Sequence, residues 1–223
     1  MIWNCRGHFR SLWLIFLLVG TEMASAGSYE DFFKAVNQDD SSQVRRLLVR
    51  GFDANTADPS GQTGLHLALH EFSLKSALVL IEWPGTDVNQ LNAQGESALM
   101  LAAVKGQTEL AAKLIEKKAD VNKTGWTALH YAASAGHLDL ISLLLENSAY
   151  IDAESPNRTT PLMMAARYGS VAAVKLLLDQ DADPQLKNQQ GLAALDFAQQ
   201  GNRPDAAEII ASHLRKKQTP GKW

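Results

Sequence analysis

Thr63-Gly64-Leu65-His66-Leu67-Ala68 is the first of four copies of one six-residue phrase in this chain. The other copies occupy residues 97–102, 127–132 and 160–165, and a weaker fifth copy occupies residues 193–198. Successive copies begin 34, 30, 33 and 33 residues apart. A repeat of this length, with the same order of small, apolar and polar residues in each unit, indicates a solenoid of stacked supersecondary units.

Each phrase is followed by a second apolar segment with helical spacing. Between Ser170 and Asp179 the apolar residues recur three and four positions apart, as one face of a helix requires, at Val171, Val174, Leu177 and Leu178. Helices of about ten residues are too short to be stable alone in water. We therefore predict an all-α fold in which short helices bury their apolar faces within and between repeats.

The repeated motifs resemble those of the ankyrin repeat family. The resemblance rests on the phrase at 127–132, on the second-helix segment 136–146 and on the repeat-closing turns at 86–89, 119–122 and 182–184. It covers about residues 29–214 and implies helix-turn-helix units with hairpin fingers, about six units including caps. The implied organisation is an N-terminal capping repeat at 27–57, four repeats at 58–187, a C-terminal capping repeat at 188–214 and a frayed tail at 215–223.

Two kinds of residue mark the expected ends of the first helix in each repeat. Thr127 and Thr160 stand where an N-cap hydroxyl would satisfy free backbone donors. Gly106, Gly136 and Gly169 stand where the helix ends, and we expect a left-handed conformation at each.

Two units depart from the common repeat length. Trp83-Pro84-Gly85 is an insertion that accounts for the 34-residue step, and the loop from Asp120 to Thr127 is three residues shorter than its counterparts. Insertions and deletions in solenoids often collect on the binding face. Surface loops also vary in length without any function, so both interpretations stay open at this stage.

Arg158 occupies a position at which the other copies have Gly61, Gly95, Gly125 and Gly191. If this turn requires a positive φ, a side chain there is strained. Either the turn has changed type, or the guanidinium is presented to a partner. The strain argument predicts that Arg158→Gly raises thermal stability slightly.

The first 26 residues have the pattern of a cleavable secretory signal peptide. Arg6, His8 and Arg10 precede an apolar run over 12–19, and Ala24-Ser25-Ala26 supplies the small-residue cleavage site. The run is far shorter than the ~20 residues that a membrane-spanning helix needs. We expect cleavage after Ala26, a periplasmic location like that of the exported ankyrin proteins of Gram-negative bacteria, and no membrane insertion after cleavage.

The composition excludes several classes of function. The single cysteine, Cys5, lies in the predicted leader, so the remaining chain has no thiol for catalysis or disulfides. The whole chain carries a net charge of −3 and has no basic stripe, which argues against nucleic acid as the partner. We find no nucleophile elbow, phosphate loop or metal motif, and we expect no enzyme activity, cofactor or metal.

Two histidines raise a metal alternative. His66 and His70 lie four positions apart, a spacing that brings two ligands to one helix face. However, His66 and His130 occupy the histidine position of the ankyrin motif, and the resemblance implies that their imidazoles hydrogen-bond neighbouring repeats. We favour this structural interpretation.

The resemblance also implies where a protein partner would bind, namely at the fingertips and the exposed ends of the first helices, on the concave face. Carried over position by position, the candidate contact residues are Gln62, His70, Glu71, Glu96, Lys105, Trp126, Arg167 and Tyr168. Trp126, Arg167 and Tyr168 stand out because Trp, Tyr and Arg dominate binding hot spots. A Trp before the Thr of this motif also often only covers the neighbouring finger.

These observations predict a non-enzymatic periplasmic protein-binding module, monomeric because both ends are capped. The alternatives are an immunity protein that blocks a toxin acting in the periplasm, and an accessory factor for a periplasmic enzyme such as catalase. A hydrolase with an unrecognised site and a tether of envelope components are further alternatives from other classes.

Overall fold

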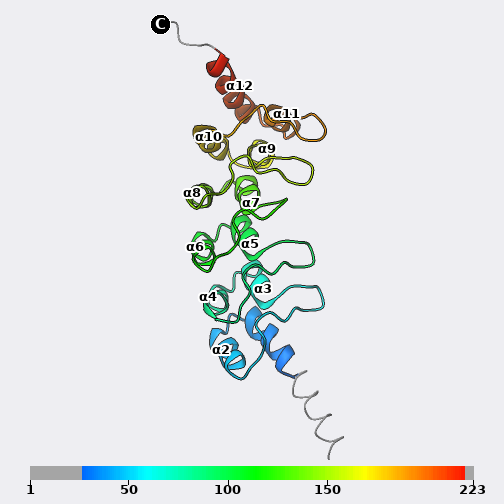
Figure 1. Ribbon diagram of the computed structural model, residues 1–223, viewed down its shortest axis with the longest axis vertical. Helices are drawn as coiled ribbons and strands as arrows, with labels where there is room; N and C mark the ends of the chain where they lie inside the picture. Colours follow the sequence, from blue (N-terminus) through cyan, green and yellow to red (C-terminus); the bar gives the residue numbers. More distant parts are fainter. Residues whose placement is uncertain (1–26, 219–223) are drawn as a thin grey trace, which may run out of the picture.

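The computed structural model describes residues 27–218, and over this range the chain is an elongated stack of short helices (Figure 1). The predicted signal peptide and its cleavage site lie outside the described residues, as do residues 219–223. Among the described helices, none is both long enough and apolar enough to cross a membrane.

The helices follow one another in pairs, as the repeated phrase predicts. The described chain begins in a helix over 27–37, which precedes α2. Each later pair consists of an inner helix that starts with the repeated phrase and an outer helix that follows it. The bounds are α2 (Ser41–Val49), α3 (Gly64–His70), α4 (Leu74–Glu82), α5 (Ala98–Val104), α6 (Thr108–Glu116), α7 (Ala128–Ala135), α8 (Leu138–Glu146), α9 (Pro161–Tyr168), α10 (Val171–Asp179), α11 (Ala194–Gln200) and α12 (Pro204–Gln218).

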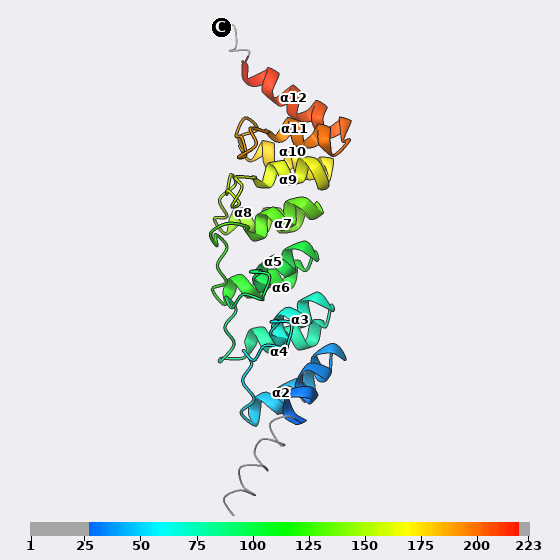
Figure 2. The same ribbon diagram turned by 90° about the vertical axis from the view of Figure 1, so that its right-hand side faces the viewer.

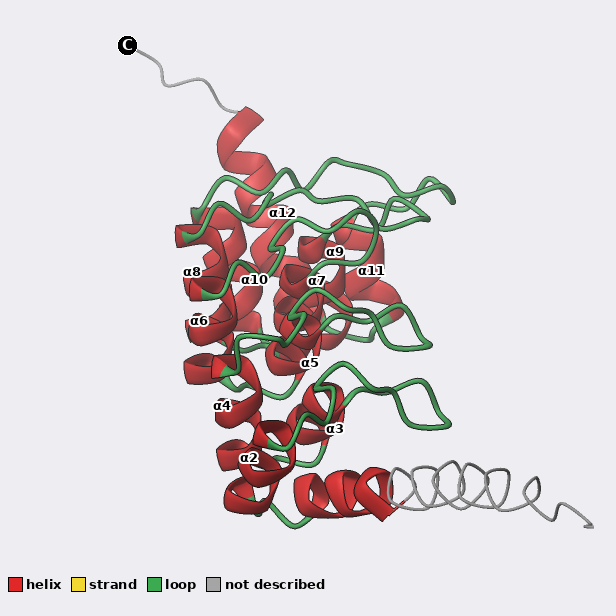
Figure 3. Cartoon of the chain, turned by 60° about the horizontal axis from the view of Figure 1, so that its bottom comes forward, coloured by secondary structure: helices red, strands yellow, loops and turns green. Residues whose placement is uncertain are grey.

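The pairs form two columns and a row of loops. In Figure 1 the outer helices α2, α4, α6, α8 and α10 lie at the left, and the inner helices α3, α5, α7, α9 and α11 lie beside them. Figure 2 shows the pairs stacked one above another from α2 to α12. We call the loops before α3, α5, α7, α9 and α11 fingers one to five; counted from the repeat-closing turn they span residues 53–63, 87–97, 120–127, 150–160 and 183–193, so finger three is three residues shorter than the others. Figure 3 shows them extending from one side of the stack, away from the outer helices. This architecture confirms the predicted all-α ankyrin solenoid.

One apolar core runs the length of the stack. The predicted face of α10 is buried at Val174, Leu177 and Leu178. Pairs of alanines on the inner helices are fully buried, and they let neighbouring inner helices approach closely, at Ala102, Ala103, Ala132, Ala133, Ala165 and Ala166. Because these faces are buried mainly between repeats, each short helix depends on its neighbours for stability.

The turns that close the repeats form a second linkage between units. The side chain of Asn89 accepts a hydrogen bond from the backbone N–H of Asp120 (2.8 Å) and donates one to the carbonyl of Lys118 (3.1 Å). Asn55 and Asn122 make the same pair of bonds to the repeat that follows each of them. The Asp-Val-Asn turn of the sequence motif therefore ties one repeat to the next.

Predictions about helix ends are only partly confirmed. Gly106 (φ 72°) and Gly136 (φ 76°) are left-handed as expected, but the prediction is wrong for Gly169, whose φ is −79°. Glycine is required at 169 for another reason, because a Cβ there would overlap the carbonyl oxygen of Ala133. In the first full repeat the left-handed position is taken by Phe72 (φ 59°).

The N-cap prediction is confirmed for Thr160 but not for Thr127. The Thr160 hydroxyl accepts a bond from the N–H of Met163 (3.4 Å). Thr127 is also an N-cap residue, but its hydroxyl contacts Nδ1 of His130 (2.9 Å) instead of capping the backbone.

The frayed tail predicted from residue 215 is wrong for residues 215–218, which continue α12. Helix α12 is therefore longer than the other outer helices. A run of basic residues at its C-terminal end, Arg215 to Lys217, is favourable next to the negative end of the helix dipole.

Candidate protein-binding face

Fingers one, two, four and five close with the same hydrogen bonds. In finger two the N–H of Asn92 donates to the carbonyl of Glu96 (3.0 Å), and the Asn92 side-chain oxygen accepts from the N–H groups of Gln94 and Glu96. Asp58 and Asn188 do the same in fingers one and five, and the Ser155 hydroxyl accepts from Thr159 in finger four. These fingers are shaped by bonds within their own few residues.

Finger four carries Arg158 in the turn. Its φ is 62°, so the turn has kept the left-handed conformation that glycine supplies elsewhere. The guanidinium makes two bonds to the carboxylate of Glu154 (2.9 and 3.0 Å), and both side chains are exposed. This hydrogen bonding lowers the pKa of Glu154 and raises the pKa of Arg158. Of the two explanations of Arg158, a change of turn type is therefore wrong.

Finger three, the shortened one, is built differently. It reaches less far than its neighbours (Figure 1), and among its described residues 120–127 the closing bonds of the other fingers are absent. The Trp126 ring instead packs edge-on against the His130 ring of α7, with centroids 5.2 Å apart. The conformation of finger three therefore depends on the packing of a side chain against the next helix.

His130 beneath Trp126 is fully buried and fully bonded. Its Nδ1 accepts from the N–H of Thr127 (3.2 Å), so Nε2 carries the proton and donates to the carbonyl of Thr159 in finger four (2.9 Å). Burial lowers the pKa of His130 to about 4. The neutral imidazole thus links fingers three and four, as the sequence predicts for this position.

His66, at the same position two repeats earlier, makes only half of these bonds. Its Nδ1 accepts from Thr63 (3.3 Å), but its buried Nε2 makes no hydrogen bond of good geometry. Burial lowers the pKa of His66 as well. His66 therefore has the predicted position, while its tie to the next repeat is weaker than that of His130.

A small hollow lies beside finger three, and we call it the notch. It has a volume of about 220 Å³ and is lined by Trp126, His130, Tyr131, Ser134 and Met164, from finger three, α7 and α9. Its walls are largely apolar or aromatic. A hollow of this size suits one side chain and is smaller than the ~300 Å³ at which small-molecule pockets begin.

One carboxylate stands at the edge of the notch. The hydroxyl of Tyr131 donates a hydrogen bond to Oε1 of Glu96, in the preceding repeat (3.2 Å). Burial, and then the charge of Glu96, raise the pKa of Tyr131 to about 12. The structure thus brings two predicted residues close to Tyr131: Trp126 lines the same hollow, and Glu96 accepts the hydrogen bond of the Tyr131 hydroxyl.

A second cluster forms at the C-terminal ends of α9 and α11. The guanidinium of Arg167 lies over the ring of Tyr168 (5.2 Å to the centroid) and donates to the side chain of Gln200 (3.1 Å). Tyr168 is 57% exposed. An exposed tyrosine ring in contact with a guanidinium that is itself bonded to Gln200 has the character of a binding hot spot.

The remaining predicted residues form separate local pairs. His70 contacts the carboxylate of Glu71 (2.9 Å), the Lys105 ammonium lies over Phe72 (5.4 Å), and Gln62 bonds Ser60 (3.3 Å). None of these residues lines the notch.

Sequence reasoning missed three residues of this face: Tyr131, Met164 and Phe72. Tyr131 and Met164 follow the histidine position of the motif, where the first two copies have Leu67 and Leu101. A departure from leucine at this position was the available signal. Phe72 stands in the left-handed position that Gly106 and Gly136 take in later repeats, and the sequence signal was the missing glycine.

The metal alternative has no support in the geometry. His66 is buried against Thr63, whereas His70 is exposed and paired with Glu71. Within residues 27–218 no group of three or more His, Cys, Asp or Glu side chains is arranged to hold a metal ion.

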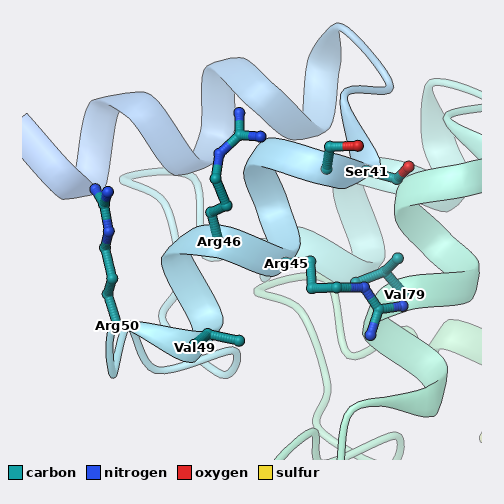
Figure 4. A pocket seen from close by; sticks show the side chains of 7 residues that line it. Ser41, Arg45, Arg46, Val49, Arg50 and Val79 are labelled. Atoms are coloured by element: carbon teal, nitrogen blue, oxygen red, sulfur yellow. The ribbon is translucent and has the colours of Figure 1, made fainter.

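A larger open groove lies on the other side of the stack, along α2. It has a volume of about 510 Å³, and its lining includes Arg45, Arg46, Arg50, Val49 and Val79. Figure 4 shows that Arg46 and Arg50 extend to the same side, whereas Arg45 extends toward Val79 of α4. The Arg46 guanidinium is bonded to Gln43. The groove is basic, in contrast to the notch.

Comparison with known proteins identifies the family. A family model described as ankyrin repeats (3 copies) matches residues 69–157 and 150–219, which is more than half of the chain. The chain therefore belongs to the ankyrin repeat family. This places it among ankyrin protein-binding modules, a class that is typically a non-catalytic scaffold.

Two curated relatives share this region. The ankyrin repeat and SAM domain-containing protein 6 of Rattus norvegicus is 34% identical over 131 residues, which is 56% of this chain and 11% of the rat protein. The putative palmitoyltransferase ZDHHC13 of Danio rerio is 32% identical over 171 residues, 76% of this chain and 22% of the fish protein. The chain thus spans less than a quarter of the length of either relative.

Two solved structures match nearly their whole length. One is the immunity protein Bd3460 in its complex with the predatory endopeptidase Bd0816 from Bdellovibrio bacteriovorus. The immunity protein is 28% identical to this chain with a TM-score of 0.70, and the match covers 82% of this chain and 97% of the immunity protein. The other is the ankyrin repeat protein EF0377, 31% identical with a TM-score of 0.71, over 81% of this chain and 96% of that chain.

Proposed function

We propose that this chain is an exported inhibitor of the immunity type, a non-enzymatic periplasmic module that binds an exported hydrolase and blocks it. The observation that carries the proposal is the likeness to Bd3460, which extends over 97% of that immunity protein. The leader pattern in residues 1–26 supports export, since it combines basic residues, a short apolar run and an Ala-x-Ala site. An endopeptidase is the first partner to test.

The mechanism would be the rigid presentation of a preformed surface. Four fingers are closed by their own hydrogen bonds, and the asparagine side chains of the repeat-closing turns link successive units. Little ordering entropy is therefore lost when the surface binds a partner, so more of the contact energy appears as affinity. Inhibition then requires only that the bound module covers the enzyme's active site.

The finger side is the proposed binding face. It carries Tyr168 and Arg167 at the end of α9 and Trp126 in finger three, and these residue types dominate hot spots. Tyr150, in the repeat-closing turn after α8, is 68% exposed and provides a matched tyrosine outside the candidate contact residues. The two tyrosines therefore distinguish the end of α9 from the repeat-closing turn.

The test is capture followed by inhibition. The mature chain, residues 27–223, is used to capture partners from a periplasmic extract, and the captured enzyme is assayed with increasing amounts of wild type, Tyr168→Ala and Tyr150→Ala. We expect wild type to inhibit, Tyr168→Ala to need at least about tenfold more protein, and Tyr150→Ala to match wild type. If Tyr150→Ala is the weaker inhibitor, the face is wrong. If no captured enzyme is inhibited, the inhibitor function is wrong.

A further inference from the structure

The notch beside finger three has unusual hydrogen-bonding chemistry. The Tyr131 hydroxyl donates its proton to Glu96, and the Ser134 hydroxyl donates its proton to the carbonyl of Tyr131 (2.9 Å). Both hydroxyl oxygens are therefore left as acceptors. The two ring nitrogens of His130 are occupied by Thr127 and Thr159. Apart from the Trp126 indole N–H, the polar groups at the notch accept hydrogen bonds and do not donate them.

The charged groups around the notch also favour a positively charged ligand. Glu96 has no ion-pair partner among residues 27–218. Three cations of the repeats around finger three make contacts of their own: Arg158 is paired with Glu154, Lys105 lies over Phe72, and the Lys123 ammonium donates to the carbonyl of Thr124 (3.2 Å). The buried imidazole of His130 is neutral at physiological pH, so it adds no positive charge beneath the hollow. The Asn92 amide donates to Oε2 of Glu96 (2.9 Å) and Tyr131 donates to Oε1, so both oxygens are bonded by neutral groups and the negative charge has no cationic partner within residues 27–218.

The walls favour a cation with an apolar stem. Trp126 and Tyr131 contribute aromatic rings, and Met164 contributes a flexible apolar contact. Aromatic faces attract ammonium and guanidinium groups. Lysine and arginine combine such a head, which donates hydrogen bonds and accepts none, with an apolar stem of three or four carbons.

We propose that the notch is the recognition pocket for one basic side chain, a lysine or arginine, that the protein partner inserts between fingers two and four. The stem lies against Trp126 and Met164, and the cationic head is directed to the oxygens of Tyr131 and Glu96. This inference rests on the proposed protein-binding function and adds the chemistry of the contact. The shortened finger three leaves the pocket open to the partner.

The test uses small probes and therefore does not need the partner. The indole N–H signal of Trp126 in the mature chain, assigned by its loss in Trp126→Phe, is followed by NMR during titration with N-acetyl-arginine amide and N-acetyl-lysine amide. N-acetyl-norleucine amide, which has an apolar stem and no charge, is the control probe. We expect the basic probes to shift this signal with millimolar affinity and norleucine to bind about tenfold more weakly.

The decisive variant is Glu96→Gln. It keeps an oxygen that accepts from Tyr131 and removes the charge, so it should weaken the basic probes about fivefold and leave norleucine unchanged. Glu71→Gln removes a carboxylate that does not line the notch, so it should leave the binding of all three probes unchanged. Equal binding of norleucine, equal binding to Glu96→Gln, or no shift of Trp126 would overturn the basic-side-chain assignment.

These outcomes are separable from those of the inhibition test. If the mature chain inhibits a captured enzyme but ignores both basic probes, only the chemistry of the notch is wrong. If the probes bind as expected and no enzyme is inhibited, the notch keeps its preference and the inhibitor function is wrong.

Discussion

Fingers two and three are neighbours in one solenoid, yet they hold their shapes by different means. Finger two is closed from within, because the side chain of Asn92 accepts two backbone N–H groups of its own loop. Finger three is three residues shorter and lacks these bonds among residues 120–127, and Trp126 packs on His130 instead. His130 is in turn bonded to finger four. A closed finger is therefore a local structure, whereas finger three takes its shape from the repeats around it.

The notch lies at the finger that lacks these closing bonds. The short finger exposes the side chains at its base, and the notch opens between Trp126 and Met164 of the next repeat. The recess thus coincides with the shortened finger, and side chains of two neighbouring repeats form its walls.

The largest expected effect concerns the imidazole under finger three. Burial lowers the pKa of His130 to about 4 from an ordinary value of 6.5, so protonation is unfavourable in the folded state. Its stabilising contribution is fully present above pH 6.5 and is lost as the pH falls from 6.5 to about 4. We expect up to roughly 3 kcal/mol of unfolding free energy to disappear over this window, as measured by urea unfolding at several pH values.

The chain supplies a matched variant for this prediction. Met100 and Met163 occupy the position of His130 in other repeats, with the sulfur facing the N-cap N–H. His130→Met should therefore fold, and its stability should fall less steeply between pH 6.5 and 4 than that of wild type. The remaining slope includes His66, whose pKa is also lowered. An unchanged slope in His130→Met would show that His130 is not the titrating group.

A smaller effect separates the two kinds of finger directly. Asn92→Ala removes the acceptor of two backbone N–H groups, so we expect it to cost about 1–2 kcal/mol of unfolding free energy. Thr124→Ala changes finger three, where no such closure exists, and should be close to neutral. Amide hydrogen exchange should also become faster in finger two of Asn92→Ala. Equal costs for the two substitutions would contradict the distinction.

The smallest effect is expected in finger four. Arg158 has a φ of 62°, the conformation that glycine provides in the other fingers. Arg158→Gly relieves this strain and loses only an exposed ion pair with Glu154. We expect the melting temperature to rise by about 2 °C in calorimetry. An unchanged or lower melting temperature would disprove the strain argument.

Much of the fold was predictable because the same sequence pattern recurs in successive repeats. The spacing of the phrase at 63–68 and its copies predicted the helix pairs, and the glycine pattern predicted the left-handed turn that Arg158 occupies. Gly169 was misread because its need for glycine arises from the closeness of Ala133, in the previous repeat. The tail was misread because apolar periodicity ends before the helix does, at 214 against 218.

The sequence predicted where the candidate binding residues lie along the chain, but it did not predict which side chains they contact. Motif register placed Glu96 in finger two and Trp126 in finger three. It did not show that Tyr131 would bond Glu96, or that Met164 would complete the notch. The sequence alone determined the register of the solenoid, because periodicity is a property of the chain itself. Only the tertiary structure decided which side chains share a pocket, because residues about one repeat apart meet through the stacking of helices and the choice of rotamers.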